Sequence, residues 1–134
     1  MAASSFDWGD YLELAKRLWD ASEAKLAPPP ALRRDEALRR SVISRAYYAA
    51  FHPANAYVKR GSSGAGRQGN QHEVTWSTLA TSRDSAERLI GHKGDQLKKL
   101  RVDADYYPRP VNDTQVSQAL QLSRTVREML DRKA

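Results

Sequence analysis

Apolar residues recur at intervals of three and four along most of the chain, a spacing that predicts α-helices. We expect a first helix that begins after Asp7, the candidate N-cap, and runs to Lys25 or Leu26. Its inward stripe contains Trp8, Leu12, Ala15 and Trp19, widened by Leu14 and Leu18. Because both tryptophans follow the helical period, they are better core anchors than stacking platforms for bases. Three prolines at 28–30 end the helix.

The longest helical pattern extends from Ala31 to about Lys59 and has two parts. Its first third, LRRDEALRR, is charged and amphipathic, which predicts a solvated face, although its arginines also suit phosphate contacts. The following SVISRAYYAAFH is apolar almost all round, as is typical of the central helix of a bundle. Pro53 removes an N–H group and crowds the carbonyl of Ala49, so we expect a kink or break there.

Three polar side chains interrupt this apolar segment, namely Arg45, Tyr48 and His52. Their spacing of i, i+3 and i+7 puts them on one side of the helix. An unpaired buried charge is costly, so these groups need partners from another helix, a second subunit or a ligand. We therefore predict a homodimer with this polar cluster near the centre of a two-fold interface.

Three more helices follow from the pattern. Asn70 and Glu73 form a capping-box pattern at the start of a helix that carries Val74 and Leu79 and ends near Thr81. The next helix runs from about Asp84 to Tyr106, and its expected inward residues are Ala86, Leu89, Ile90, Leu97 and Leu100. Two glycines at 91 and 94 weaken its middle and allow a bend. The last helix opens with a second capping-box pattern and carries Val116, Ala119, Leu120, Ser123, Val126 and Leu130.

A glycine-rich segment at 61–70, GSSGAGRQGN, contains the spacing G-x-G-x-x-G at Gly64, Gly66 and Gly69. The dinucleotide-binding fingerprint requires a strand before this motif and a βαβ unit around it. A helical pattern precedes it instead, and no segment of the sequence alternates like a strand. We therefore predict a mobile loop at 61–70 and no dinucleotide site.

The segment 97–108, LKKLRVDADYYP, is where candidate chemistry gathers. Its expected buried face consists of Leu97, Leu100, Ala104 and Tyr107. Arg101 lies at the edge of this stripe, and Asp105 and Tyr106 complete a cluster of guanidinium, carboxylate and phenol. Pro108 disfavours helical geometry at the residue before it, so the helix should end here. The alternative is an ordinary surface pair of Arg101 with Asp105, worth ~0.2–0.5 kcal/mol.

Composition limits the kinds of ligand, metal site and cellular location that we expect for this chain. The 134 residues fit one domain, 1–134, and 22 basic against 16 acidic residues give a net charge of +6, which permits an anionic partner such as nucleic acid. There is no cysteine, and the three histidines at 52, 72 and 92 form no pair with ligand spacing, so we predict no metal site and no cofactor. The first residues lack a signal-peptide pattern, and no apolar run reaches ~18 residues, so the cytoplasm is the expected location, without membrane insertion.

The block SRAYYAAFH, then His72 opening a later helix, then LKKLRVDADYY resembles the HEPN domain family. The resemblance extends from about Arg40 to the last helix. It implies an all-α fold, a four- to five-helix and largely up-and-down bundle. It also implies a homodimer that places an arginine of each subunit near the shared interface.

Many HEPN proteins are metal-independent endoribonucleases that use an arginine followed four to six residues later by a histidine. Arg101 matches that arginine, Val102 replaces the common asparagine, and Tyr106 takes the place of the histidine. The candidate catalytic residues are thus Arg101, Asp105 and Tyr106, and the candidate binding residues are Arg45, Tyr48, His52 and Tyr107. A phenol, with an ordinary pKa near ~10, is a poor base at neutral pH, so we predict weak RNA binding with slow cleavage or none. His52 is a candidate substitute for the missing base.

Other HEPN proteins are partners of minimal nucleotidyltransferases in toxin–antitoxin pairs, in which a tyrosine near the arginine accepts a nucleotide. In that pattern a histidine lies between the arginine and the tyrosine, and Tyr106 and Tyr107 match it only in part. Two hypotheses therefore stand. One is an RNA-directed protein, and the other is a dimeric interaction module whose partner is a nucleotidyltransferase or another protein.

Overall fold

A computed structural model describes residues 7–23, 36–61 and 70–133, and this part of the chain is helical, with no strand. Five helices follow one another: α1 (Gly9–Glu23), α2 (Glu36–Gly61), α3 (Gln71–Ala80), α4 (Ser85–Tyr106) and α5 (Asp113–Lys133). The predicted all-α bundle is confirmed. None of the described helices is both long enough and apolar enough to cross a membrane.

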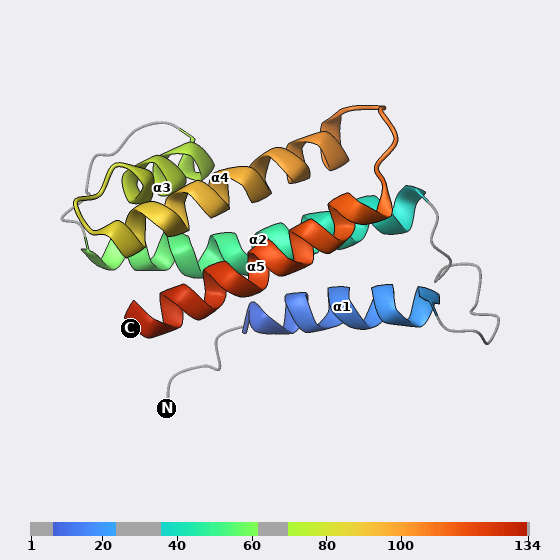
Figure 1. Ribbon diagram of the computed structural model, residues 1–134, viewed down its shortest axis with the longest axis horizontal. Helices are drawn as coiled ribbons and strands as arrows, with labels where there is room; N and C mark the ends of the chain where they lie inside the picture. The colour runs from blue at the N-terminus through green and yellow to red at the C-terminus, as the bar shows by residue number, and fades with distance from the viewer. Residues whose placement is uncertain (1–6, 24–35, 62–69, 134) are drawn as a thin grey trace.

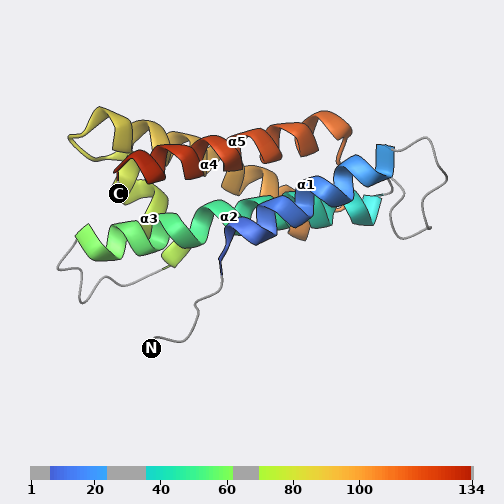
Figure 2. The same ribbon diagram turned by 90° about the horizontal axis from the view of Figure 1, so that it is seen from below.

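The four long helices lie side by side and alternate in direction along the bundle (Figure 1). The chain reverses from α1 to α2, again from α2 to α4, and once more from α4 to α5 (Figure 2). The short helix α3 packs beside the first part of α4, at the end of the bundle where α2 ends. Helix α2 contacts each of the other four helices, which confirms its predicted central position.

Side chains from all five helices form one hydrophobic core. The largest fully buried side chains are Trp76, Tyr47, Ile43, Ile90, Leu97, Val42, Val116 and Val126, together with Thr75 and Ser123. Helix α2 contributes the largest share of the core, since apolar residues occupy most of its circumference. Over most of the described chain, the apolar residues at helical spacing are therefore the ones that are buried, as predicted.

Helix α2 continues through Pro53, so the predicted break does not occur. Proline at this position leaves the carbonyl of Ala49 without its helical N–H partner. Arg127 of α5 supplies the missing donor, because its Nη1 lies 2.7 Å from the Ala49 oxygen. A long-range hydrogen bond therefore replaces the local one and keeps the central helix continuous.

Two glycines of α4 allow α3 to approach it closely. A Cβ atom added to Gly91 would lie 2.3 Å from the backbone nitrogen of Ala80. A Cβ atom added to Gly94 would lie 2.1 Å from the Trp76 ring. The sequence predicts weakness and a bend at these positions, whereas the structure gives them a packing role.

Local capping fixes the starts of three helices, at two of which the sequence predicted a capping box. Asp84 caps α4, accepting from the N–H groups of Ala86 at 2.8 Å and Glu87 at 3.2 Å. The box at α5 is reciprocal: each side chain of Asn112 and Gln115 accepts from the backbone N–H of the other, at 2.8 and 2.9 Å. At α3 only the Asn70 half forms, with the His72 N–H at 2.9 Å, because Glu73 pairs with Lys98 instead.

Three predicted inward residues are exposed instead: Leu14 (44%), Leu89 (46%) and Tyr107 (49%). Leu14 and Leu89 lie on sides of α1 and α4 that no other described helix covers, because each stripe is wider than the contact it makes. Tyr107 leaves the helical face because α4 ends at Tyr106 and the next residue is extended (φ −113°, ψ 140°) before Pro108. The predicted end of the first helix, the prolines at 28–30, the start at Ala31 and the glycine loop at 62–69 lie outside the described residues.

Candidate functional site

Arg101 lies on α4 and is buried, with 7% of its surface exposed, rather than at the edge of the apolar stripe. Its guanidinium carbon lies 5.0 Å from the ring centroid of Tyr47, and 5.6 Å from those of Tyr48 and Tyr106. Aromatic faces attract a cation at these distances. The guanidinium is therefore held in a pocket of three tyrosine rings.

The hydrogen bonds of Arg101 leave part of its donor capacity unused. Its Nη1 donates to the Asp105 carboxylate and to the Tyr48 hydroxyl, each at the long distance of 3.5 Å. Its Nε is buried and has no hydrogen-bond partner among the described residues. An exposed surface ion pair, the alternative that the sequence left open, is therefore excluded by burial. A guanidinium with an unused N–H donor can bind an anionic ligand.

A groove of about 400 Å³ lies between α1, α2 and the end of α4. Its lining consists of Tyr11, Arg40, Ser41, Ser44, Arg45, Tyr48 and Asp105. Arg101 does not itself line the groove, but its two hydrogen-bond partners, Tyr48 and Asp105, do, so the groove is next to the surroundings of the guanidinium. The predicted residue Arg45 lines the groove and donates to Ser41, one turn earlier on α2.

His52 lies half-buried on the same side of α2. Its ring stacks on Trp8, the residue before α1, with 3.6 Å between centroids, and on Tyr48 with 5.7 Å. Burial lowers the pKa of His52 below its ordinary value, so the imidazole is neutral at pH 7. Trp8, just before α1, and Arg101 of α4 therefore supply contacts to the polar side of α2, for which the sequence predicted partners.

A second imidazole, His72, belongs to the same cluster. The Tyr47 hydroxyl lies 2.6 Å from Nδ1 of His72, and Trp76 Nε1 donates to that hydroxyl at 3.0 Å. Phe51 stacks on the His72 ring with 4.1 Å between centroids. The sequence pattern did not single out His72, Tyr47 or Trp76 as site residues. The only sequence indication was that His72 and the tyrosine pair of SRAYYAAFH belong to the same resemblance.

Burial is also the main reason that the pKa of His72 lies below its ordinary value, and the positive charges of Arg101 and Lys98 lower it further. Burial raises the pKa of the Tyr47 hydroxyl, which therefore keeps its proton throughout the physiological range. The site thus combines one permanent cation with two neutral imidazoles and a protonated phenol.

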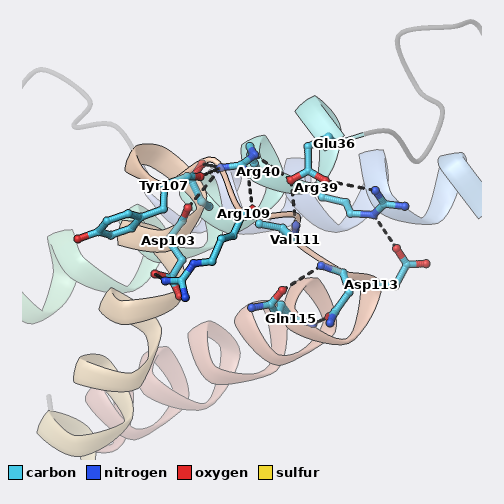
Figure 3. A network of polar contacts seen from close by, with 11 residues as sticks. Glu36, Arg39, Arg40, Asp103, Tyr107, Arg109, Val111, Asp113 and Gln115 are labelled. Atoms are coloured by element: carbon cyan, nitrogen blue, oxygen red, sulfur yellow. Dashed lines mark hydrogen bonds and ion pairs between the residues drawn. The ribbon is translucent and has the colours of Figure 1, made fainter.

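The remaining predicted residues divide into two groups. Tyr106 is 70% exposed, and its ring lies against the Arg101 guanidinium. Tyr107 does not join the cluster: its ring faces Arg109, whose guanidinium carbon is 5.7 Å from the ring centroid. Figure 3 shows Tyr107 and Arg109 together at the end of α4. Tyr107 therefore contacts the α4–α5 connection, whereas Tyr106 contacts the Arg101 guanidinium.

Arg40 holds the end of α4 in place (Figure 3). Its guanidinium donates to four backbone carbonyls, those of Asp103 at 3.3 Å, Ala104 at 2.7 Å, Tyr107 at 2.8 Å and Arg109 at 2.6 Å. Glu36 accepts from Nε of Arg40 and from the backbone N–H of Val111, both at 2.9 Å. The predicted solvated face is therefore wrong for Arg40, which satisfies carbonyls that a helix end leaves without partners. This contact positions the turn that carries Asp105 and Tyr106.

Within the described residues, no group of three or more histidine and carboxylate side chains could hold a metal ion. The chemistry that these side chains can supply is anion binding by Arg101, hydrogen bonding by hydroxyl and imidazole groups, and stacking on exposed rings.

Acidification below about pH 6.5 should lower the free energy of unfolding. Burial lowers the pKa of His52 and His72 from the ordinary value of 6.5, so the unfolded chain binds protons at a pH where the folded chain does not. Stability that is complete above pH 6.5 is therefore lost as the pH falls toward the lowered folded-state values.

Urea denaturation at intervals from pH 7.5 to pH 5.0 measures this loss. Replacing both residues, in the variant His52→Gln/His72→Gln, should make the free energy of unfolding depend less on pH in this range. His92→Gln, at an exposed position of α4, is the matched control and should leave it unchanged. An undiminished slope in the double variant would show that other groups cause the dependence.

Comparisons of the chain with protein-family models, with curated proteins and with solved structures give no match. The ligand of the site is therefore inferred from its chemistry. That chemistry is a buried guanidinium with an unpartnered N–H, beside a groove that contains two further arginines and several hydroxyl groups.

Proposed function

We propose that this protein is an HEPN-like, RNA-directed protein that binds a backbone phosphate of RNA through Arg101. The observation that carries the proposal is the unused donor capacity of the Arg101 guanidinium, whose Nη1 makes only two long hydrogen bonds of 3.5 Å and whose Nε has no partner among the described residues. A guanidinium matches the geometry of a phosphate group, and two N–H donors can bind it side by side. The net charge of +6 adds long-range attraction for a polyanion.

Single-stranded RNA fits this surface better than a duplex. Tyr106 presents an exposed ring next to Arg101, so one base can stack on it while the adjacent phosphate reaches the guanidinium. Base–aromatic stacking contributes ~1–3 kcal/mol per base and tolerates any sequence. Arg45 and Ser44 in the neighbouring groove are available for the next phosphate along the strand.

Metal-independent cleavage of this RNA is expected to be slow. Attack by the 2′-hydroxyl needs a base that is effective near neutral pH, and a phenol at position 106 is not. In His72, Nδ1 is already occupied by the Tyr47 hydroxyl. His52 remains the candidate base, since it is neutral at pH 7 and no described residue hydrogen-bonds to its ring. Its stacking between Trp8 and Tyr48 restricts its movement toward the Arg101 site.

Replacement of Arg101 should remove most of the RNA binding. A hydrogen bond to a charged group is worth ~1.5–3 kcal/mol, so Arg101→Ala should weaken binding of a twelve-nucleotide single strand by about 10- to 100-fold. Arg101→Lys should also weaken it, because lysine keeps the charge but lacks the planar fork. Fluorescence anisotropy over a range of salt concentrations measures both effects, and wild-type affinity should fall steeply with salt.

Lys99→Ala is the matched control for Arg101→Ala. It removes one positive charge from the same helix, but Lys99 is 74% exposed and pairs with Asp95. Lys99→Ala should cause only a small loss of RNA affinity, and this loss should disappear at high salt. Equal affinity of wild type, Arg101→Ala and Arg101→Lys, with equal melting temperatures, would overturn the proposal.

Placing the histidine of the family motif in this protein should increase cleavage. In Tyr106→His, an imidazole would replace a ring that now lies 5.6 Å from the Arg101 guanidinium carbon. RNA digestion without metal, with chelator present, compares wild type with Tyr106→His. The double variant Tyr106→His/Arg101→Ala controls for contaminating nuclease. Fast cleavage by wild type that depends on Arg101 would show that the tyrosine is no obstacle.

A second candidate function is favoured by the exposure of Tyr106, whose ring is 70% accessible beside a guanidinium. In this alternative the protein is a dimeric interaction module, and a partner nucleotidyltransferase modifies the Tyr106 hydroxyl. An added nucleotidyl mass on Tyr106, in protein purified from its own cells, would favour it over RNA binding. Both candidate functions include a homodimer. Light scattering at tens of micromolar protein tests it, and a monomer mass would show that the homodimer does not form.

A further inference from the structure

A chain of three side chains determines which nitrogen of His72 carries the proton. The indole N–H of Trp76 can only donate, so the oxygen of Tyr47 accepts at 3.0 Å. The hydroxyl proton of Tyr47 is then directed to Nδ1 of His72, 2.6 Å away. Since Nδ1 accepts this hydrogen bond, a neutral His72 must carry its proton on Nε2.

The surroundings keep His72 both neutral and immobile. Burial, followed by the charges of Arg101 and Lys98, lowers its pKa, so the imidazole carries no charge at pH 7. Phe51 stacks on one face of the ring. Tyr47 connects the imidazole to the guanidinium, because the same ring that donates to His72 lies 5.0 Å from the guanidinium carbon of Arg101. No described residue accepts a hydrogen bond from Nε2, so that N–H is available to a ligand.

We propose that His72 is a second ligand of the anion held by Arg101, and that it donates a hydrogen bond from Nε2–H to a phosphate oxygen. Tyr47 and Trp76 are positioning residues that fix this tautomer. The proposal rests on the proposed function in one respect, namely that the anion in the cell is an RNA phosphate. It also assigns His72 a role other than general base, because neither ring nitrogen of the neutral form is free to accept a proton.

Heteronuclear NMR of the histidine rings tests the tautomer directly. Long-range correlations in nitrogen-15-labelled protein at pH 7.5 should show a protonated Nε2 and an unprotonated Nδ1 at His72. In Tyr47→Phe the hydroxyl is absent, and the same spectrum should show a mixture of the two tautomers. A His72 protonated on Nδ1 in wild type would overturn the proposal.

Titration with inorganic phosphate tests the ligand role. His72→Gln should stay within about three-fold of wild type, because the glutamine amide reaches the position of Nε2. His72→Asn and His72→Ala should bind phosphate about ten-fold more weakly, because asparagine reaches only the position of Nδ1 and alanine has no donor. The backbone cap at Asn70 is the same in all three variants, so helix α3 should remain formed. Equal affinity of all three variants would overturn the proposal.

The two proposals fail in different ways. If phosphate binding depends on Arg101 and His72 but RNA does not bind, only the proposed function is lost. If RNA binding depends on Arg101 while the Nε2 resonance of His72 is unaffected by both RNA and phosphate, the function stands and the ligand role of His72 is wrong. If phosphate affects neither residue at tens of millimolar, the ligand role is likewise overturned.

Discussion

Gly91→Ala should destabilise the fold by about 2 kcal/mol or more, a large loss for the addition of one methyl group. The added carbon would lie 2.3 Å from the backbone nitrogen of Ala80 and 2.7 Å from its Cα. Backbone atoms cannot yield as the end of a flexible side chain can, so α3 must move away from α4 as a unit. The gain of ~1 kcal/mol in helix propensity from glycine to alanine offsets only part of this cost.

Gly94→Ala should have a comparable effect with a further consequence for the site. Its added carbon would overlap the Trp76 ring at 2.1 Å, and the indole N–H of Trp76 holds Tyr47. Displacement of Trp76 should therefore disturb the Tyr47–His72 pair as well as the packing of α3. Loss of the His72 tautomer preference in the NMR spectrum is the expected readout.

Gly61→Ala is the matched control for both variants. Gly61 is the last residue of α2, and a Cβ atom there would have no neighbour within 4 Å. Its free energy of unfolding should stay within about 0.5 kcal/mol of wild type, as is usual for a surface substitution. Urea denaturation of the three variants measures the difference. Wild-type stability in both Gly91→Ala and Gly94→Ala would show that the close approach of α3 is wrong.

Arg40→Met should cost about 2–3 kcal/mol, because the guanidinium is the donor to four carbonyls at and beyond the end of α4. Methionine preserves most of the length of the side chain but donates no hydrogen bond. The carbonyl groups of Asp103 and Ala104, whose bonds to Arg40 are partly buried, then depend on water for a partner. Glu36 also loses its partner at Nε, which is 2.9 Å away.

Arg39→Met is the adjacent control. Arg39 forms ion pairs with Glu36 and Asp113, whose side chains are 41% and 51% exposed, so its replacement should cost less than about 1 kcal/mol. Thermal unfolding compares the two variants, and RNA binding at low temperature gives a second readout. Arg40→Met should weaken RNA binding more than Arg39→Met, because it releases the turn that holds Asp105 and Tyr106. Equal losses of RNA affinity in the two variants would show that the removal of one positive charge, and not the release of the turn, weakens RNA binding.

The sequence by itself determined the helices and most of their ends. Helix formation follows from apolar spacing within about ten residues, and caps such as Asp84 and the pair of Asn112 and Gln115 act over two or three residues. The end of α4 before Pro108 is equally local. The sequence also placed Arg101, Asp105 and Tyr106 in one cluster, since helical spacing alone brings them together.

Tertiary structure alone decided which polar groups meet across helices. Arg127 supports Ala49 across 78 residues, Arg40 reaches the end of α4 across more than 60, and Tyr47 meets His72 across 25. Periodicity describes one helix at a time and cannot give the rotation or contact of its neighbours. For this reason the burial of Arg101, the hydrogen bond between Tyr47 and His72 and the packing role of Gly91 and Gly94 depend on how α2, α3 and α4 pack together.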